Sequence, residues 1–482
     1  MPSFPLPFPA GLPVGASWLP ASATAPVRFP YDGSTVAEAP VGNVALAHLA
    51  LDEAVAVKEQ VADLAAHVRR TVLMRVHADV EAARERLVDL LVLETGKPLV
   101  DCRVEVARTL VTLAASAEEV SRIHGETVPL DLTPAGEGLL GFWLRRPIGV
   151  VVGIAGFNYP LLLATHKIAP AFAAGCPVIA KPAPQTPLAT LWLVHLFREA
   201  LAAAGGPVAA VQLVTGDAEV GAALVTDRRI GAVSFTGSAP VGHRIARAAA
   251  PTKVLLELGS NAALVVAADA DLDAAADAVV TGGYYASGQA CISVQRVIVV
   301  DEVHDALVSR ITSRLADVVV GDPRDESTRI APLVDAAATA RVRSWVDDAV
   351  AAGARLLHGG GADDPLGPTV LDGVPDGANA WDEEVFGPVV CIRAVDDIDA
   401  AFKTVNQSHY GLHASVFTRS LDIAMRAARC LEVGGVLVNV IPGFRADTMP
   451  YGGVKDSGIG REGPRFAVDE LTVSRMVILR AG

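Results

Sequence analysis

Short β-branched runs alternate with alanine-rich segments of helical length from Pro147 onward, and this alternation constrains the fold more than any other feature of the chain. Strand runs that alternate with helices are typical of βαβ units and a parallel sheet. We therefore predict an α/β fold with an architecture of the dinucleotide-binding type. The runs that carry this prediction are IGVVVGI, PVIAKP, VQLVTG, AVSFTGS and KVLLEL.

Other signals lie on both sides of this alternating part. Residues 44–119 place apolar side chains at helical spacing, which predicts long amphipathic helices. After Asn261 a second set of strand runs follows, RVIVV, VVCIRAV, HASVFT and GGVLVNV, and this part carries Cys291. The first twenty residues are apolar and rich in proline, which breaks helices, so we expect an extended arm along the surface.

Composition excludes several classes of function. A chain of 482 residues, 51% of them hydrophobic, is long enough for roughly three domains with a large buried core. Its net charge of −14 and its lack of a basic block disfavour nucleic acid as a partner. No apolar run reaches the roughly 18 residues that a membrane helix requires, so we expect a soluble protein with no membrane partner.

The cysteines and acidic residues show no pattern of a disulfide framework or a metal site. The five cysteines lie far apart without a CxxC pair, which indicates a reducing compartment, and we expect a cytoplasmic protein. The chain has no HExxH motif. The run DADLD at 269–273 lacks the glycine and the distal glutamate of a calcium loop, and it predicts the N-terminus of a helix.

Cys291 in GQACISVQR is the strongest candidate for chemistry, because small residues surround a thiol in a segment that favours exposure over packing. An isolated free cysteine is more often a buried structural residue. Two upstream residues change that balance: Asn158 in GIAGFNYP and Glu257 in LLELGSNA each follow a strand-like apolar run. Taken singly, the asparagine favours a turn residue and the glutamate a charge at a strand end.

Seven segments in order resemble the aldehyde dehydrogenase superfamily, and they span about two-thirds of the chain. The residues in these segments are most similar to those of the lactaldehyde dehydrogenase-like branch, whose members oxidise small hydroxylated or anionic aldehydes. The segments are FNYP (157–160), KPAPQTP (181–187), FTGS (235–238), ELGSNA (257–262), GQAC (288–291), EEVFGPV (383–389) and PYGGVKDSGIGREG (450–463).

The resemblance implies three structural parts and a homodimer or homotetramer. A Rossmann-type cofactor domain is expected at 1–124 and 148–259, and an α/β catalytic domain at 260–464. A small β oligomerisation element is expected at 125–147 and 465–482, where LTVSRMVIL alternates like an edge strand.

The resemblance also assigns a catalytic set. The Cys291 thiol attacks the aldehyde carbon, and the Asn158 amide and the Cys291 N–H stabilise the oxyanion. After hydride transfer a thioester remains, and Glu257 is the candidate base that activates water for its hydrolysis. Lys167 and Glu462 match a supporting proton-relay pair.

The cofactor residues come partly from local pattern and partly from the resemblance. Gly458, Gly460 and Gly463 form GxGxxG, but too little chain follows for a βαβ unit, so we interpret them as a turn. Ser238 stands between a strand and a helix, where helical N–H groups can face a pyrophosphate, or where it simply caps the helix. The remaining cofactor residues that the resemblance implies are Ile154, Phe157, Lys181, Pro184, Gly221, Phe235, Glu384 and Phe386.

Position 184 bears on the choice of cofactor. The resemblance assigns Lys181 to the adenosine ribose, and many members of the family have a glutamate three residues later. Such a carboxylate repels the 2′-phosphate of NADP. Pro184 stands here instead, so the sequence admits either NAD or NADP.

Arg108, Tyr159 and Arg445 are the candidate substrate residues. Either arginine can hold a carboxylate, sulfonate or phosphonate by a two-pronged contact, or can serve a structural or solvated role. Tyr159 and Ala290 leave fewer cationic groups than a strongly phosphonate-specific pocket needs. Two other functions stay open: an acylating dehydrogenase that passes the thioester to coenzyme A, and a catalytically silent relative.

Overall fold

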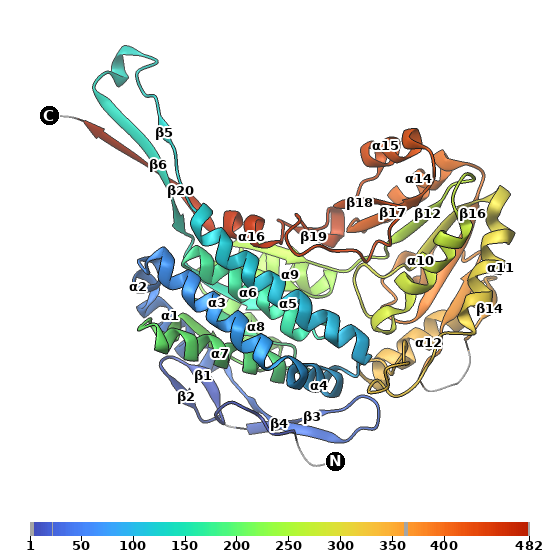
Figure 1. Cartoon of the computed structure of the whole chain (residues 1–482), viewed down its shortest axis with the longest axis horizontal. Coiled ribbons are helices and arrows are strands. Elements are labelled where there is room, and N and C mark those ends of the chain that lie inside the picture. Colours follow the sequence, from blue (N-terminus) through green and yellow to red (C-terminus); the bar gives the residue numbers. More distant parts are fainter. Residues whose placement is uncertain (1–3, 22, 361–364, 481–482) are drawn as a thin grey trace.

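The computed structural model describes residues 4–21, 23–360 and 365–480. Figure 1 shows two lobes side by side and a narrow β arm that projects from the first lobe, away from the second. The predicted strands form two separate large sheets, one in each lobe. No helix in the described part of the chain is long and apolar enough to cross a membrane.

A six-stranded sheet forms the centre of the first lobe, in the order β19-β11-β10-β7-β8-β9. Its five neighbouring strands from β11 to β9 run parallel, as the alternation predicts, and β19 is antiparallel to β11. The strands are β7 (Val150–Ile154), β8 (Val178–Lys181), β9 (Val211–Leu213), β10 (Ile230–Thr236), β11 (Lys253–Glu257) and β19 (Gly458–Ile459).

The strand order of this sheet predicts a ligand-binding crevice at the carboxyl ends of its strands. Strands β8 and β9 follow β7 in the sequence and lie on one side of it. Strands β10 and β11 come next and lie on the other side of β7. In open α/β sheets, ligands bind at the carboxyl ends of the strands where the order reverses in this way. The crossover helices are α6 (Pro160–Ala174), α7 (Leu188–Ala203), α8 (Ala218–Val225) and α9 (Ala239–Ala249).

The helices predicted within residues 44–119 are confirmed, and they pack on the first lobe with their apolar side chains in its core. Figure 1 shows them layered across α6 and α7. They are α1 (Val44–Ala56), α2 (Lys58–Ala62), α3 (Ala66–Ala82), α4 (Arg84–Thr95) and α5 (Leu99–Glu119).

The N-terminal segment is not the extended surface arm that its prolines predict. β1 (Leu12–Val14) pairs with β2 (Ser17–Leu19), and β3 (Ala23–Arg28) pairs with β4 (Thr35–Val41). Leu12 is fully buried, and Gln212 accepts a hydrogen bond from the N–H of Gly15. Contact with Gln212 of β9 therefore holds the first of these two hairpins against the lobe. Residues 1–3 of the expected arm lie outside the described residues.

A seven-stranded sheet forms the second lobe, in the order β14-β15-β16-β13-β12-β17-β18. The strands are β12 (Ala263–Val266), β13 (Arg296–Val300), β14 (Arg355–His358), β15 (Thr369–Asp372), β16 (Val389–Val395), β17 (His413–Phe417) and β18 (Gly435–Val438). The helices are α10 (Leu272–Tyr284), α11 (His304–Leu315), α12 (Ala336–Ala351), α13 (Asn379–Asp382), α14 (Ile398–Asn406) and α15 (Leu421–Cys430). Asp271 caps α10, which confirms the helix start predicted from DADLD.

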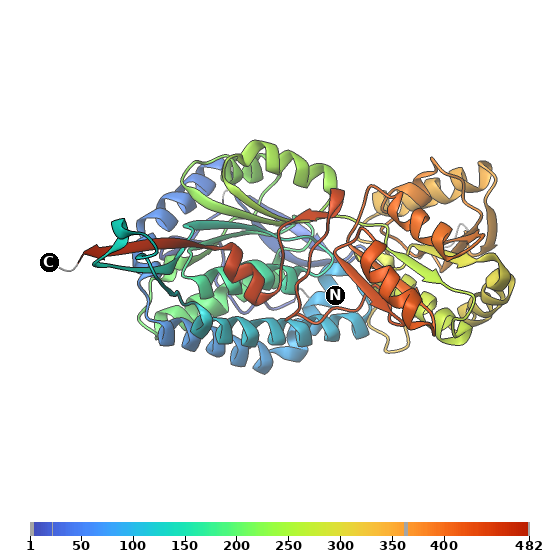
Figure 2. The ribbon, with the colours of Figure 1, turned by 90° about the horizontal axis from the view of Figure 1, so that it is seen from above.

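The projecting arm is a three-stranded antiparallel sheet (Figure 2). It consists of β5 (Thr127–Val128), β6 (Leu139–Pro147) and the C-terminal strand β20 (Thr472–Arg480), which pairs with β6 along its whole length. The sequence places both segments in one β element, and the structure does the same. Its role in oligomerisation stays a prediction.

The segment before β20 returns to the first lobe. β19 extends the sheet beside β11, and α16 (Pro464–Glu470) packs against α5 and α6. The expected catalytic region, 260–464, therefore contains a stretch that is structurally part of the first lobe. This return brings Glu462 next to α6, and the other domain boundaries stay a prediction.

Candidate active site

Cys291 lies in the second lobe, in the loop that follows α10. Ala286 and Ser287 in this loop have left-handed backbone conformations, with φ values of 48° and 57°. Such conformations are costly for residues other than glycine and persist only where the surroundings fix them. Asp101 on α5 accepts a hydrogen bond from the N–H of Ala286 at 3.0 Å, and Ser287 binds Ala331 through its hydroxyl. The loop is therefore held by groups from both lobes.

A cavity of about 660 Å³ opens above Cys291 and extends between the lobes. Burial raises the pKa of the Cys291 thiol to about 12, although a hydrogen bond with the Tyr451 hydroxyl opposes this shift. At rest the thiol is therefore protonated at neutral pH. The cavity walls include four predicted catalytic or substrate residues besides the cysteine: Asn158, Arg108, Tyr159 and Arg445.

Asn158 reaches Cys291 from the other lobe. It lies between β7 and α6, and its Nδ2 donates a hydrogen bond to the carbonyl of Gln289 at 2.8 Å. This contact leaves the second N–H of the amide for another acceptor. Within the described ranges, no protein group accepts from the Cys291 N–H. Two donors are thus available beside the thiol.

Glu257, at the end of β11, is buried, and its Oε2 has no hydrogen-bond partner among the described residues. Burial raises its pKa well above the usual range, and the nearby charge of Glu462 raises it further. The carboxyl therefore keeps its proton to a higher pH than an ordinary glutamate does, and it does not line the cavity. A base at this position has to lose its proton before it can activate water.

A network of buried charges lies beside Glu257. Lys167 donates a hydrogen bond to Glu462, and Arg445 donates to the other oxygen of Glu462 at 3.1 Å. Although burial opposes it, Lys167 and His166 hold the pKa of Glu462 well below its usual range. Lys167 can approach β7 this closely because position 153 is glycine, where a Cβ would lie 2.8 Å from the Lys167 Cβ. The sequence-predicted pair of Lys167 and Glu462 is in direct contact.

The network continues along the cavity wall. Arg108 on α5 donates two hydrogen bonds to Asp447, at 2.8 and 3.0 Å. His166 lies between two acids, 3.2 Å from Asp447 and 3.4 Å from Glu462. Burial opposes it, but His166 and Arg108 hold the pKa of Asp447 below its usual range. Both sequence-predicted arginines thus line the cavity and already hold protein carboxylates.

The predicted cofactor residues surround the crevice of the first sheet. Ile154, Phe235 and Lys181 lie at corresponding register positions near the carboxyl ends of β7, β10 and β8. Lys181 lies against Gly221, where an added Cβ would be 3.5 Å from the lysine Cε, and Pro184 is exposed beyond the same strand end.

The structure also offers groups that fit a bound dinucleotide. Ser238 precedes α9, but its side chain makes no capping bond, so the hydroxyl is not committed to the helix. The buried hydroxyl of Thr236 has no partner among the described residues. Both residues line the cavity, and the N-terminus of α9 beside them favours a phosphate.

Glu384 and Phe386 approach from the second lobe. Glu384 accepts a hydrogen bond from the N–H of Ser260 at 2.9 Å, and burial raises its pKa to about 7. Phe386 has a φ of 50°, and its ring meets that of Phe157 edge to face at 5.6 Å between centroids. Both of these predicted cofactor residues therefore line the same cavity as Cys291.

Comparison with known proteins identifies the family of this chain. The sequence profile of the aldehyde dehydrogenase family matches residues 18–477. The chain belongs to the aldehyde dehydrogenase family. It is 43% identical to the 3-sulfolactaldehyde dehydrogenase of Priestia aryabhattai over 85% of this chain and 86% of that protein. It is 34% identical to the lactaldehyde dehydrogenase of Methanococcus aeolicus over 94% and 96% of the two chains.

A solved structure agrees with the fold as well. The glyceraldehyde-3-phosphate dehydrogenase GapN of Methanocaldococcus jannaschii, solved in complex with NADP, superposes with a TM-score of 0.91. It is 33% identical, with coverage of 95% of this chain and 100% of that one. The chain is thus an NAD(P)-dependent aldehyde dehydrogenase, as the sequence resemblance implies.

Several residues at the site of this aldehyde dehydrogenase were not identified from the sequence. Tyr451 lies in the segment PYGGVKDSGIGREG and Asp447 lies three residues before it, but no spacing rule distinguishes either residue. His166 is adjacent to the predicted Lys167 on α6. Glu105 lies one helical turn before Arg108 on α5, a spacing that places both on one helix face.

A buried ion pair fixes the segment that carries Asn158. Lys97 and Glu105 form a salt bridge in which both side chains are almost fully buried. Lys97 also donates to the Asn158 carbonyl at 2.8 Å, and Glu105 accepts from the N–H groups of Leu161 and Leu162 at the start of α6. The Lys97 Nζ lies 3.6 Å from the centroid of the Tyr159 ring. Tyr159, a predicted substrate residue, is held by the same pair.

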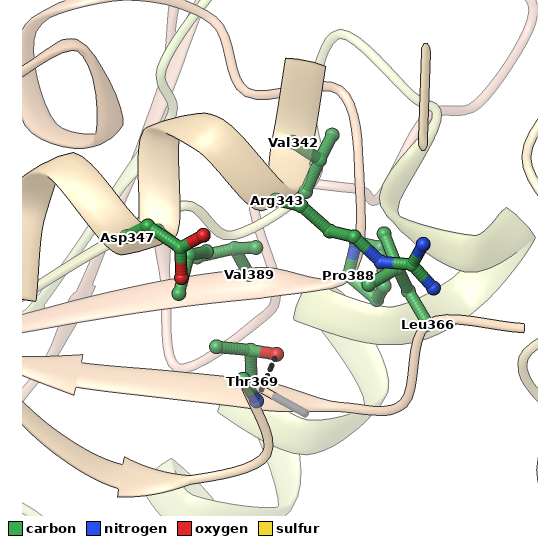
Figure 3. A pocket seen from close by; sticks show the side chains of 9 residues that line it. Val342, Arg343, Asp347, Leu366, Thr369, Pro388 and Val389 are labelled. Carbon is green, nitrogen blue, oxygen red and sulfur yellow. Dashed lines mark hydrogen bonds between the residues drawn. The ribbon is translucent and has the colours of Figure 1, made fainter. Parts of the chain in front are cut away.

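A second hollow, of about 250 Å³, lies in the second lobe (Figure 3). Residues of α12 such as Val342 and Asp347 face Thr369 and Val389 on β15 and β16 across it. None of its lining residues belongs to the predicted catalytic, cofactor or substrate set.

The Lys97–Glu105 pair generates a prediction about stability. Replacing Glu105→Gln leaves a buried ammonium group without its counter-charge, so we expect a loss of about 3–5 kcal/mol in the free energy of unfolding. The matched control is Arg103→Gln on the same helix, which breaks an exposed pair with Glu326 and is expected to cost about 0–1 kcal/mol. Urea unfolding of both variants measures the difference. Equal, small losses would contradict a positioning role for the buried pair.

Proposed function

We propose that this protein oxidises a small anionic or hydroxylated aldehyde to its carboxylic acid through a covalent intermediate on Cys291, with NAD or NADP as the hydride acceptor. The observation that carries this proposal is a single cavity that joins Cys291 and Asn158 to Ser238, Glu384 and Phe386. A thiol, an oxyanion donor and groups suited to a cofactor thus meet in one space that a small aldehyde can enter.

The proposed reaction begins with attack of the Cys291 sulfur on the aldehyde carbon. The oxyanion of the resulting thiohemiacetal is stabilised by the free N–H of the Asn158 amide and by the Cys291 N–H. A nicotinamide held by Glu384 and Phe386 would supply the acceptor for the hydride that leaves this carbon. The thioester left on Cys291 is then hydrolysed by water, and Glu257 is the proposed base.

The proton on Glu257 sets a pH dependence for hydrolysis. Burial and Glu462 keep this carboxyl protonated well above its usual range, and only the deprotonated form accepts a proton from water. Deacylation therefore accelerates as pH rises through the raised pKa. The adjacent Lys167–Glu462 pair supports a route by which the proton leaves.

Charge around the cavity supports an anionic substrate. Lys167, Arg108 and Arg445 contribute three positive charges, which face two ionised carboxylates, Asp447 and Glu462. Burial raises the pKa of Glu257, so this carboxyl adds less negative charge to the group than an ordinary glutamate would. The arginines of the cavity wall would attract an aldehyde that carries a carboxylate, sulfonate or phosphonate. The similarity to a 3-sulfolactaldehyde dehydrogenase supports the same substrate class.

Hydrolysis is favoured over transfer to coenzyme A, because a carboxyl group lies beside the proposed thioester. A base that activates water would waste an acyl group intended for another acceptor. Product analysis with and without coenzyme A separates the two outcomes.

We further propose the domain division given by the resemblance, except for the return of β19 and α16 to the first lobe, and assembly as a homodimer or homotetramer. Two exposed apolar edges support self-association: β20, with Met476 and Ile478 exposed, and β18, next to the exposed Phe444. The free cysteines support a reducing location, for which we propose the cytoplasm.

We expect measurable turnover with both cofactors. The exposed Pro184 offers no carboxylate against a 2′-phosphate, and Lys181 lies nearby to attract it. Introducing Pro184→Glu should lower kcat/KM for NADP selectively, and Pro184→Gln, which adds a similar volume without charge, is the matched control. Steady-state rates at 340 nm measure the effect. Strict use of NAD by the unaltered enzyme would show that another residue excludes the phosphate.

The substrate class is tested by the ratio of kcat/KM for an anionic aldehyde to that for a neutral aldehyde of equal length. A panel of lactaldehyde, succinic semialdehyde, phosphonoacetaldehyde, sulfolactaldehyde and a long apolar control identifies the best anion. Replacing Arg108→Ala removes one positive charge from the wall, and we expect this ratio to fall about tenfold or more, as for the loss of a hydrogen bond to a charged group.

Two further variants give this test its direction. Arg108→Lys keeps the charge but loses the two-pronged contact, so it should retain part of the preference. Asp447→Asn removes a negative charge and should raise the ratio. Equal losses on both substrates in Arg108→Ala would mean that Arg108 only supports the fold, and a preference for long apolar aldehydes would contradict the proposed substrate class.

A further inference from the structure

Tyr451 contacts the proposed nucleophile directly, although no sequence pattern distinguishes this residue. Its hydroxyl oxygen lies 3.2 Å from the Cys291 Sγ, and either atom can be the donor. The residue is almost fully buried, and backbone hydrogen bonds in both directions hold it against Glu462. The position of the hydroxyl is thus fixed by the same segment that carries the buried charges.

The phenol can act only as a donor to a thiolate. Burial, together with the nearby Cys291, raises the pKa of Tyr451 well above its usual value, so it keeps its proton at neutral pH. In the resting enzyme the thiol can donate to the phenol oxygen. Once the thiol has lost its proton, the same contact reverses, and the phenol O–H donates to the negative sulfur.

Arg445 strengthens this donor. Its guanidinium carbon lies 3.7 Å from the centroid of the Tyr451 ring, within the range of a cation–π contact. A positive charge on the ring face withdraws electron density from the phenol and makes its O–H a better hydrogen-bond donor. The ring of His413 meets the tyrosine edge to face at 5.1 Å, so the phenol is packed from a second side.

The surroundings of the sulfur otherwise disfavour negative charge. Besides burial, the negative charges of Glu384 and of Glu257, when these carboxyls are ionised, raise the pKa of the Cys291 thiol, whereas the positive charge of Arg445 lowers it. Tyr451 provides the hydrogen bond to Sγ within the described residues. The thiolate therefore depends on this phenol and on the guanidinium behind it.

We propose that Tyr451 is a catalytic residue, which stabilises the Cys291 thiolate by donating a hydrogen bond to Sγ, with Arg445 polarising the phenol from the ring face. The proposal rests on the proposed function, in which Cys291 is the nucleophile. The thiol proton passes to water in the cavity, and Tyr451 retains its own. When the carbon–sulfur bond forms, the negative charge moves to the aldehyde oxygen, and Asn158 then becomes the relevant donor.

The test measures how the rate of alkylation of Cys291 by iodoacetamide depends on pH in the protein without added cofactor. The thiolate is the reactive form, so the midpoint of the rate profile reports the thiol pKa. The exposed Cys430 also reacts, so all variants carry Cys430→Ser, and peptide mass spectrometry assigns the modified site.

Replacing Tyr451→Phe removes one oxygen atom and keeps the ring beneath Arg445. We expect the midpoint to rise by about one to two pH units, and the rate at pH 7 to fall about tenfold or more, as for a lost hydrogen bond to a charged group. Tyr410→Phe is the matched control, because its phenol lines the same cavity but binds Glu383. This control should leave the midpoint unchanged.

An unchanged midpoint in Tyr451→Phe, with circular dichroism showing a retained fold, would overturn the proposal. 3-Fluorotyrosine at position 451, a more acidic phenol, provides a second test and should lower the midpoint; a rise would also overturn it. Failure of the proposed function is distinguishable, because complete alkylation of Cys291 would then leave aldehyde oxidation intact. If alkylation abolishes activity while the midpoints stay equal, only the role of Tyr451 is wrong.

Discussion

The buried charges beside the cavity are the constraint on which the rest of the site depends. Removing a charge from water costs several kcal/mol unless an opposite charge and hydrogen bonds compensate it. Arg108 on α5, Lys167 on α6 and the acids at positions 447 and 462 satisfy one another only if three distant segments meet. The return of the chain from the second lobe to β19 and α16 is what completes this arrangement.

This arrangement also explains why the proposed chemistry lies between the lobes. Cys291 belongs to the second lobe, whereas Asn158 and Glu257 follow strands of the first. The reversal of strand order between β7 and β10 opens the crevice for a dinucleotide at the same boundary. A substrate held there faces the thiol on one side and the cofactor groups on the other. The lobes therefore contribute complementary halves of one cavity.

The sequence predicted the features that local pattern controls. β7 to β11 follow from short apolar runs, and α10 begins at the acidic cap that DADLD provides. The set of Cys291, Asn158 and Glu257 came from the family resemblance, and its catalytic role stays a prediction. The N-terminal hairpins were missed because proline content indicates only the absence of a helix, whereas their pairing depends on contacts with β9.

Features that depend on burial and long-range contact could not be predicted in this way. Nothing local to LLELGSNA indicates that Glu257 is protonated, because its pKa reflects burial and a carboxyl that is distant in sequence. Tyr451 approaches Cys291 across 160 positions of chain, and His166 meets Asp447 across 281. Such pairs can be identified only from the three-dimensional structure, because their residues are far apart in the sequence.

The most direct test of the account is to trap the covalent intermediate in the variant Glu257→Gln. Mixed with excess aldehyde and oxidised cofactor, this variant should release about one equivalent of reduced cofactor in a rapid burst and then turn over slowly, because the carboxylate acts on water only after the thioester exists. Acid quenching and mass spectrometry should then find the acyl group on the peptide that contains Cys291. No burst, or an acyl group on another residue, would contradict the account.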